Sequence, residues 1–124
     1  MSLLLDTHVV LWWLTDDPAL SDELKERLDH DPDIYVSAAT VWEAAIKQAL
    51  GKLVGPVDLP EHIRGSGFAP LPIDYEHAIV AARLPLIHRD PFDRILVAQA
   101  QCESLTLVTH DAWCQKYEVA VLAV

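Results

Sequence analysis

Residues 88–100, HRDPFDRILVAQA, contain the start of a helix and one charged residue at a position that favours apolar ones. Asp90 is a favourable N-cap, and Pro91 suits the first helical position, where a missing backbone N–H costs nothing. Helical spacing then places Asp93 on one face with three apolar residues, Leu96, Val97 and Ala100. A carboxylate at the buried end of an apolar face is costly unless a hydrogen bond, a cation or a metal compensates it. The sequence therefore predicts that a hydrogen bond, a cation or a metal compensates the charge of Asp93.

The composition of the 124-residue chain is that of a globular protein with a hydrophobic core. Hydrophobic residues make up 52% and no low-complexity tract is present, so we expect one domain over residues 1–124. No apolar run reaches membrane-spanning length, and the first residues lack the basic segment and cleavage site of a signal peptide. Cys102 and Cys114 have no metal or redox spacing, which favours buried, reduced thiols in a cytoplasmic protein. Since no apolar run is long enough to span a membrane, we also expect no membrane association.

The formal net charge of −10 argues, taken alone, against a nucleic-acid partner, because phosphate binding normally requires a basic surface. An acidic surplus can also reflect carboxylates gathered to hold a hard cation such as Mg²⁺. Composition does not separate these two explanations, but the positions of the acidic residues can.

Short apolar runs alternate with helical segments along the chain. We expect strands at residues 3–5, 34–36, 68–71, 105–108 and 119–122, with the Pro70-containing strand at a sheet edge. Helices are expected between them, including residues 38–50, and a loop over residues 52–59. A further helix, capped by Asp74 and reaching about residue 84, should turn Ala78, Ile79, Ala82 and nearby residues inward. The alternation predicts an α/β fold with a short, mostly parallel sheet and helices on both faces.

Acidic residues follow the strands of this predicted sheet. Asp6 ends the first strand and Asp111 follows the strand at residues 105–108, at the edge where open α/β sheets bind ligands. Asp6 alone would be read as a simple helix cap, and Glu43 alone as an exposed partner of Lys47. Asp93, in the first turn of its helix, should face the same edge. Together the four acids predict one carboxylate-lined cleft.

Clustered carboxylates raise one another's pKa values, and a bound divalent cation removes that conflict. Mg²⁺ or Mn²⁺ suits such oxygen ligands and could activate water for attack on a phosphodiester. The histidines have no zinc-ligand spacing, so we interpret three of them as residues at the edge of the cleft: His8, His88 and His110.

Four ordered motifs resemble the PIN domain family, and more narrowly the VapC-type toxin ribonucleases of bacterial toxin–antitoxin pairs. The motifs are Asp6-Thr7, residues 37–46 around Glu43, DPFDR with AQA at residues 90–100, and Thr109-His110-Asp111. The resemblance spans nearly the whole chain and implies a PIN-like three-layer fold. It also implies a Mg²⁺- or Mn²⁺-dependent endoribonuclease that hydrolyses RNA as the toxin of a type II module. The resemblance further implies that the chain forms a homodimer. It also implies that a cognate antitoxin binds the chain in a heterotetramer or larger complex.

The resemblance implies specific roles for the matching residues. Asp6 and Asp93 would be the principal metal ligands, Glu43 would bind directly or through water, and Asp111 would complete the site. Thr7 or Thr109 could hydrogen-bond a ligand carboxylate, and Asp90 is favoured as the helix cap with a role in the site left open. Without the four site acids the formal net charge of the chain is still −6, so contacts with RNA would need positively charged side chains near the site. The candidates are Arg89, Arg94 and Lys47.

Three other classes of protein fit the pattern less well. A phospho-receiver signalling domain would need a phosphoacceptor Asp after its middle strand and a Lys after its last, but residues 119–124 contain no Lys. A haloacid-dehalogenase-like phosphatase would need a second Asp two residues after Asp6, where His8 stands. A PIN-like domain that only binds partners would not need four intact acids.

Overall fold

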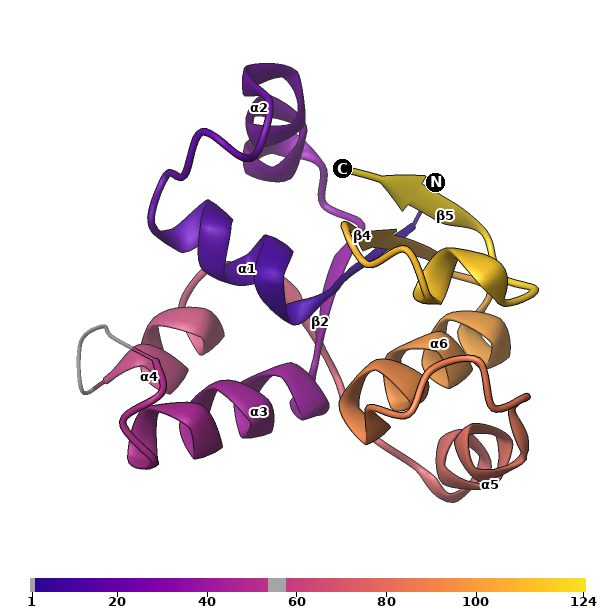
Figure 1. Ribbon diagram of the computed structural model, residues 1–124. Helices are drawn as coiled ribbons and strands as arrows, with labels where there is room; N and C mark the ends of the chain where they lie inside the picture. The colour runs from indigo at the N-terminus through magenta and orange to yellow at the C-terminus, as the bar shows by residue number, and fades with distance from the viewer. Residues whose placement is uncertain (1, 54–57) are drawn as a thin grey trace.

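The computed structural model describes residues 2–53 and 58–124 and contains a five-stranded sheet of order β3-β2-β1-β4-β5 (Figure 1). All four strand pairings are parallel. The strands are β1 (Leu3–Leu5), β2 (Ile34–Ser37), β3 (Ala69–Leu71), β4 (Thr106–Thr109) and β5 (Val121–Ala123). The helices are α1 (Thr7–Leu14), α2 (Asp22–His30), α3 (Ala38–Ala49), α4 (Leu59–Arg64), α5 (Tyr75–Arg83) and α6 (Pro91–Glu103), with a 3₁₀ turn, η1 (Cys114–Lys116).

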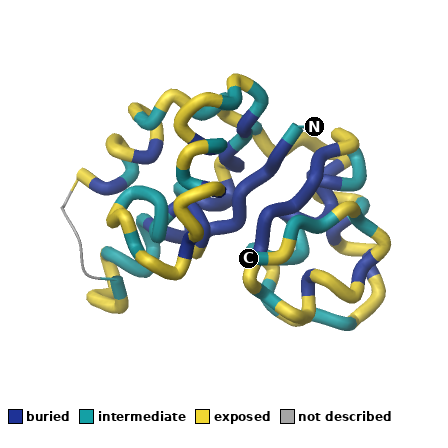
Figure 2. Tube along the Cα trace, turned by 90° about the horizontal axis from the view of Figure 1, so that it is seen from above, coloured by how far each residue is buried: buried dark blue, intermediate teal, exposed yellow. Residues whose placement is uncertain are grey.

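Helices cover both faces of the sheet, and strand side chains alternate between two apolar clusters. In β1, Leu3 and Leu5 join the cluster formed with α1, α2 and α4, whereas Leu4 joins the cluster formed with α5 and α6. Figure 1 shows these two groups of helices on opposite sides of the strands, and Figure 2 shows the central strands as the most buried part of the trace. The predicted parallel α/β fold with helices on both faces is therefore confirmed.

Side-chain caps set the starts of the helices as the sequence predicts. Ser37 begins α3 by accepting a hydrogen bond from the Ala39 amide, and Asp90 begins α6 in the same way. Gly51 has φ +70°, a conformation that favours glycine, and follows Leu50, the C-cap of α3. The predicted loop over residues 52–59 includes residues 54–57, which lie outside the described part of the chain.

One helix presents a different face from the predicted one. Ala78, Ile79 and Ala82 of α5 were expected to face inward but are exposed, and the buried residues of that helix are His77 and Ala81. His77 can occupy the interior because both ring nitrogens have partners: Nδ1 accepts from the Asp74 amide, and Nε2 lies 2.9 Å from a Glu103 carboxylate oxygen. A polar residue with satisfied hydrogen bonds thus replaces the apolar face predicted from the pattern.

The strand order places the reversal of the sheet at β1. The chain passes from β1 to β2 and β3 on one side and continues with β4 and β5 on the other, so the carboxyl ends of β1 and β4 flank the switch point. The third strand along the chain, β3, lies at the sheet edge and is followed by Pro72 rather than by an aspartate, so the phosphoacceptor expected after the third strand of a receiver domain has no counterpart there. Among the described residues, no helix is long and apolar enough to cross a membrane.

Candidate functional site

Asp6 lies at the switch point, between the end of β1 and the start of α1. Its side chain is buried and caps α1, since Oδ1 accepts the Val9 amide at 2.9 Å. Oδ2 accepts a hydrogen bond from the Thr109 hydroxyl, at the end of β4. Burial raises the pKa of Asp6 above its ordinary value, although the bonds from Thr109 and Val9 oppose that shift. The residue is therefore both a helix cap and a buried, partly compensated acid.

Glu43 enters the site from α3 and is buried, with 6% of its surface exposed. Oε1 accepts a hydrogen bond from the Thr7 hydroxyl at 2.6 Å, and Oε2 lies 2.9 Å from Nζ of Lys47. The hydrogen bond with Glu43 is the main reason why the pKa of Lys47 is raised, and the charges of Asp90 and Asp93 add to it. The expected pairing with Lys47 exists, but Glu43 faces the interior of the site rather than solvent.

Asp90 caps α6 as the sequence predicts, and Asp93 lies in the first turn of the same helix. Asp90 accepts the Phe92 amide at 2.9 Å and caps the helix. Asp93 projects from the first turn with 22% of its side chain exposed. Burial, followed by the negative charge of Asp90, raises the pKa of Asp93 from its ordinary 3.8 to about 7, while His88 opposes the shift. A nearby cation would therefore stabilise the charged form of Asp93.

Asp111 follows β4 and is strongly hydrogen-bonded. Oδ1 accepts the amides of Trp113 and Cys114 at 2.7 and 3.1 Å, and Oδ2 lies 3.0 Å from Nε2 of His88. Partial burial tends to raise the pKa of Asp111, but these hydrogen bonds outweigh it and the pKa is lowered. Thr109 joins the two strand ends, because its hydroxyl accepts the Asp111 amide at 3.0 Å and donates to Asp6.

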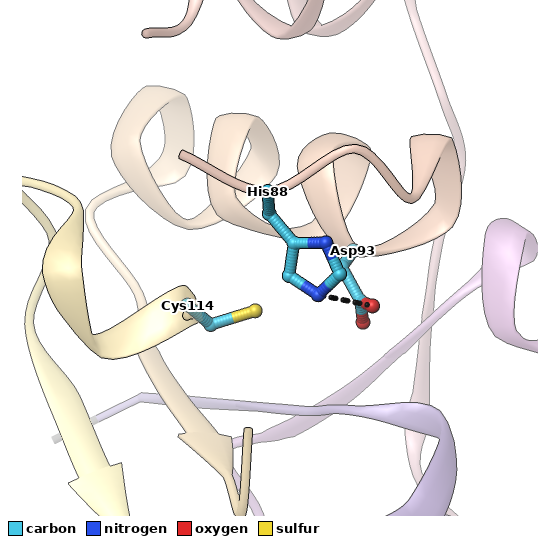
Figure 3. A group of neighbouring side chains, drawn as sticks. All are labelled: His88, Asp93 and Cys114. Atoms are coloured by element: carbon cyan, nitrogen blue, oxygen red, sulfur yellow. Dashed lines mark ion pairs between the residues drawn. The ribbon is translucent and has the colours of Figure 1, made fainter. Parts of the chain in front are cut away.

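His88 lies within this cluster, so its interpretation as an edge residue was wrong. Nε2 lies 3.1 Å from Oδ2 of Asp93 in addition to its contact with Asp111. Figure 3 shows the His88 ring directed at Asp93, with the side chain of Cys114 pointing toward the same space. Among the described residues, His88, Asp93 and Cys114 place potential ligand atoms within 4.8 Å of one another. Sequence spacing did not reveal this proximity, which arises only from the tertiary fold.

The three residues are nevertheless poorly prepared to hold a soft metal. The Asp90 amide lies 3.1 Å from Nδ1 of His88, so Nδ1 accepts and the ring hydrogen belongs on Nε2. A metal ligand would need the opposite tautomer. Burial also raises the pKa of the Cys114 thiol, and the nearby Asp93 adds to that shift, which disfavours the thiolate that binds metals. The oxygen-rich part of the site instead suits a hard cation.

The predicted RNA-contacting residues occupy different environments. Arg94 is fully engaged within the fold, as its Nη2 donates to the carbonyls of Ala81 and Leu84 at 2.8 and 2.9 Å and its Nη1 to that of Pro85 at 3.0 Å. This geometry favours a structural role for Arg94 over RNA contact. Arg89 is exposed next to the start of α6, and Lys47 is half-exposed beside Glu43.

The fold and the site define a parallel α/β domain whose switch point carries buried acids suited to a divalent cation. The sequence model of the PIN domain family matches residues 3–118. The chain is 31% identical to Ribonuclease VapC22 of Mycobacterium tuberculosis over 118 residues, covering 89% of this chain and 87% of that protein. The chain belongs to the PIN domain family.

Solved structures of other proteins share the fold, FitAcB and VapBC2 among them. FitAcB from Neisseria gonorrhoeae is 28% identical, with a TM-score of 0.70 and coverage of 97% of this chain and 96% of that one. VapBC2 from Rickettsia felis, bound to a DNA fragment from its promoter, is 14% identical, with a TM-score of 0.76 and coverage of 99% and 98%. At that identity the second likeness shows the fold alone.

Proposed function

We propose that residues 1–124 form one nuclease domain, a Mg²⁺- or Mn²⁺-dependent endoribonuclease that acts as the toxin of a cytoplasmic toxin–antitoxin pair. Asp6, Glu43, Asp93 and Asp111 are its acidic site residues. Membership of the PIN family and the 31% identity to a ribonuclease support the reaction class. The toxin role and the antitoxin partner rest on the resemblance to VapC-type proteins.

The observation that carries the proposal is the uncompensated charge of Asp93. Its pKa of about 7 reflects burial beside Asp90, with Asp111 and Glu43 contributing further negative charge. Among the described residues, only Lys47 forms an ion pair with a carboxylate of the quartet unless His88 is protonated. A divalent cation would supply the missing positive charge and the Lewis acidity to activate water for phosphodiester hydrolysis.

The surrounding residues prepare the carboxylates for that role. Thr109 and the Val9 amide fix both oxygens of Asp6, so its orientation is set before any ligand arrives. Thr7 fixes Glu43 in the same way and leaves Oε2 with Lys47. Asp6 and Asp93 would hold the cation, Glu43 would bind it or position water, and Asp111 would support the site. The exposed side chain of Arg89 remains a candidate for contact with RNA phosphate.

We propose that two copies of the chain form a homodimer through an apolar groove between α3, α5 and α6. The groove is lined largely by Trp42, Ile73, Ala78, Ala82, Phe92 and Ile95. Trp42 is 60% exposed and packs edge-on against Phe92, with ring centroids 5.1 Å apart. The exposed small residues of α5 would allow another helix to approach closely. The proposed homodimer therefore gives a role to the face of α5 that points away from the core.

RNA cleavage by the purified protein tests the proposed activity. We expect cleavage with Mg²⁺ or Mn²⁺, none with EDTA, and none for Asp6→Asn or Asp93→Asn. Asp29→Asn, which changes an exposed carboxylate at the end of α2, is the matched control and should cleave like the parent. Equal activity in all variants would indicate a contaminating nuclease and refute the assignment.

A further inference from the structure

His88, in the segment between α5 and α6, has a partner for every polar atom. Its amide donates to the hydroxyl of Tyr117 at 2.8 Å, and its carbonyl accepts from Arg94 at 3.2 Å. The Asp90 amide donates to Nδ1, and Nε2 faces the acidic cluster. With 15% of its side chain exposed, the residue is held in one position and one ring orientation.

The anchors of His88 are themselves tied to the fold. The buried Tyr117 donates its hydroxyl hydrogen to the Pro85 carbonyl at 2.9 Å. Arg94 donates to the same carbonyl at 3.0 Å and lies 3.4 Å from the Tyr117 hydroxyl. The side chains of Arg94, in the following helix, and of Tyr117, 29 positions further along the chain, therefore fix the backbone of His88.

The ring presents a fixed hydrogen-bond donor to two carboxylates on different elements. Because Nδ1 accepts a hydrogen bond, Nε2 carries the hydrogen and donates to Oδ2 of Asp111 at 3.0 Å. The same nitrogen lies 3.1 Å from Oδ2 of Asp93. Within the described part of the chain, the other oxygen of Asp93 accepts no hydrogen bond, so it is the one left to bind a ligand.

We propose that His88 is a positioning residue of this site, an inference that rests on the proposed function. It joins Asp111 to Asp93 through Nε2–H and thereby orients Asp93 toward the cation without binding the cation itself. Hydrogen-bonding partners of metal ligands typically contribute about 10- to 100-fold to metal affinity. His88 accordingly sets the affinity for Mn²⁺ rather than taking part in bond cleavage.

Two substitutions of similar polarity separate this role from general structural support. In His88→Gln, a longer amide can place an N–H donor near the position of Nε2, whereas the shorter amide of His88→Asn reaches only the position of Nδ1. Titration with Mn²⁺ alone should show affinity about 10- to 100-fold weaker for His88→Asn, and affinity close to that of the parent for His88→Gln. His30→Ala, on the exposed end of α2, is the control and should bind Mn²⁺ unchanged.

The ring hydrogen of the metal-free protein provides a second readout, independent of activity. Nitrogen-15 NMR of the imidazole should show the hydrogen on Nε2. A hydrogen on Nδ1, or a folded His88→Asn variant with parental Mn²⁺ affinity, would overturn the role of His88. If the parent itself neither binds Mn²⁺ nor cleaves RNA, the proposed function fails, and that result is distinct from unchanged binding in the variant.

Discussion

Replacing Asp93 with asparagine is predicted to stabilise the metal-free protein at neutral pH. The folded protein holds a proton on Asp93 up to about pH 7, whereas the unfolded chain releases it near 3.8. The folded state therefore binds more protons between these values, and its stability falls as the pH rises through that window. Above pH 7 the loss is complete and stability no longer depends on this group.

The magnitude follows from the two pKa values. At about 1.4 kcal/mol per pKa unit, a shift from 3.8 to about 7 gives an upper bound of about 4 kcal/mol. An asparagine removes this charge but leaves a partly buried amide, for which missing hydrogen bonds cost about 1–3 kcal/mol. We therefore expect Asp93→Asn to raise the free energy of unfolding by about 1–3 kcal/mol.

Urea unfolding in EDTA between pH 4 and pH 8 measures the effect. The difference between Asp93→Asn and the parent should grow from pH 4 to pH 7 and remain constant above, while Asp29→Asn should show no such difference. Adding Mn²⁺ should reverse the order, because a ligand that binds only the folded parent stabilises it. A variant less stable than the parent in EDTA at pH 7.5, or a gain independent of pH, would refute the electrostatic reasoning.

Four further substitutions test other contacts. Thr109→Val removes the hydroxyl that joins Asp6 to the Asp111 amide, so urea unfolding should show a loss of about 1–3 kcal/mol, and a loss below 0.5 kcal/mol would contradict that link. Arg94→Lys removes a guanidinium that donates to several carbonyls and should lower stability by about 2 kcal/mol. The same variant should bind RNA as the parent does in a filter-binding assay, whereas Arg89→Ala should bind more weakly without losing stability. Ala82→Glu places a charge in the apolar groove and should yield monomers in analytical ultracentrifugation, and dimers that persist would exclude this face.

The positions of Asp6, Asp93 and Asp111 in the fold could be predicted because each depends on a local rule. Asp6 and Asp111 follow apolar strands, and parallel strands bring their carboxyl ends to one edge. The division between Asp90 and Asp93 follows from capping and from the spacing of an apolar helical face. The catalytic and metal-binding roles of these residues remain predictions.

The contacts of His88 and Arg94 could not be predicted from the same rules. His88 reaches Asp111 across 23 positions of sequence, and its placement depends on hydrogen bonds with Tyr117 and Arg94. An arginine beside an acidic motif has the same sequence signature whether it binds RNA or caps the carbonyls of a helix. The sequence pattern predicts the wrong inward face for α5, because apolar residues occur on more than one side of that helix.

Crystals grown with Mn²⁺ provide the most direct test of the central claim that the carboxylates at the switch point form a divalent-cation site. We expect an anomalous-scattering peak in contact with Asp6 and Asp93, and no such peak in crystals of Asp93→Asn. The absence of any peak at saturating Mn²⁺, or a peak bound through His88 and Cys114 instead, would contradict the account.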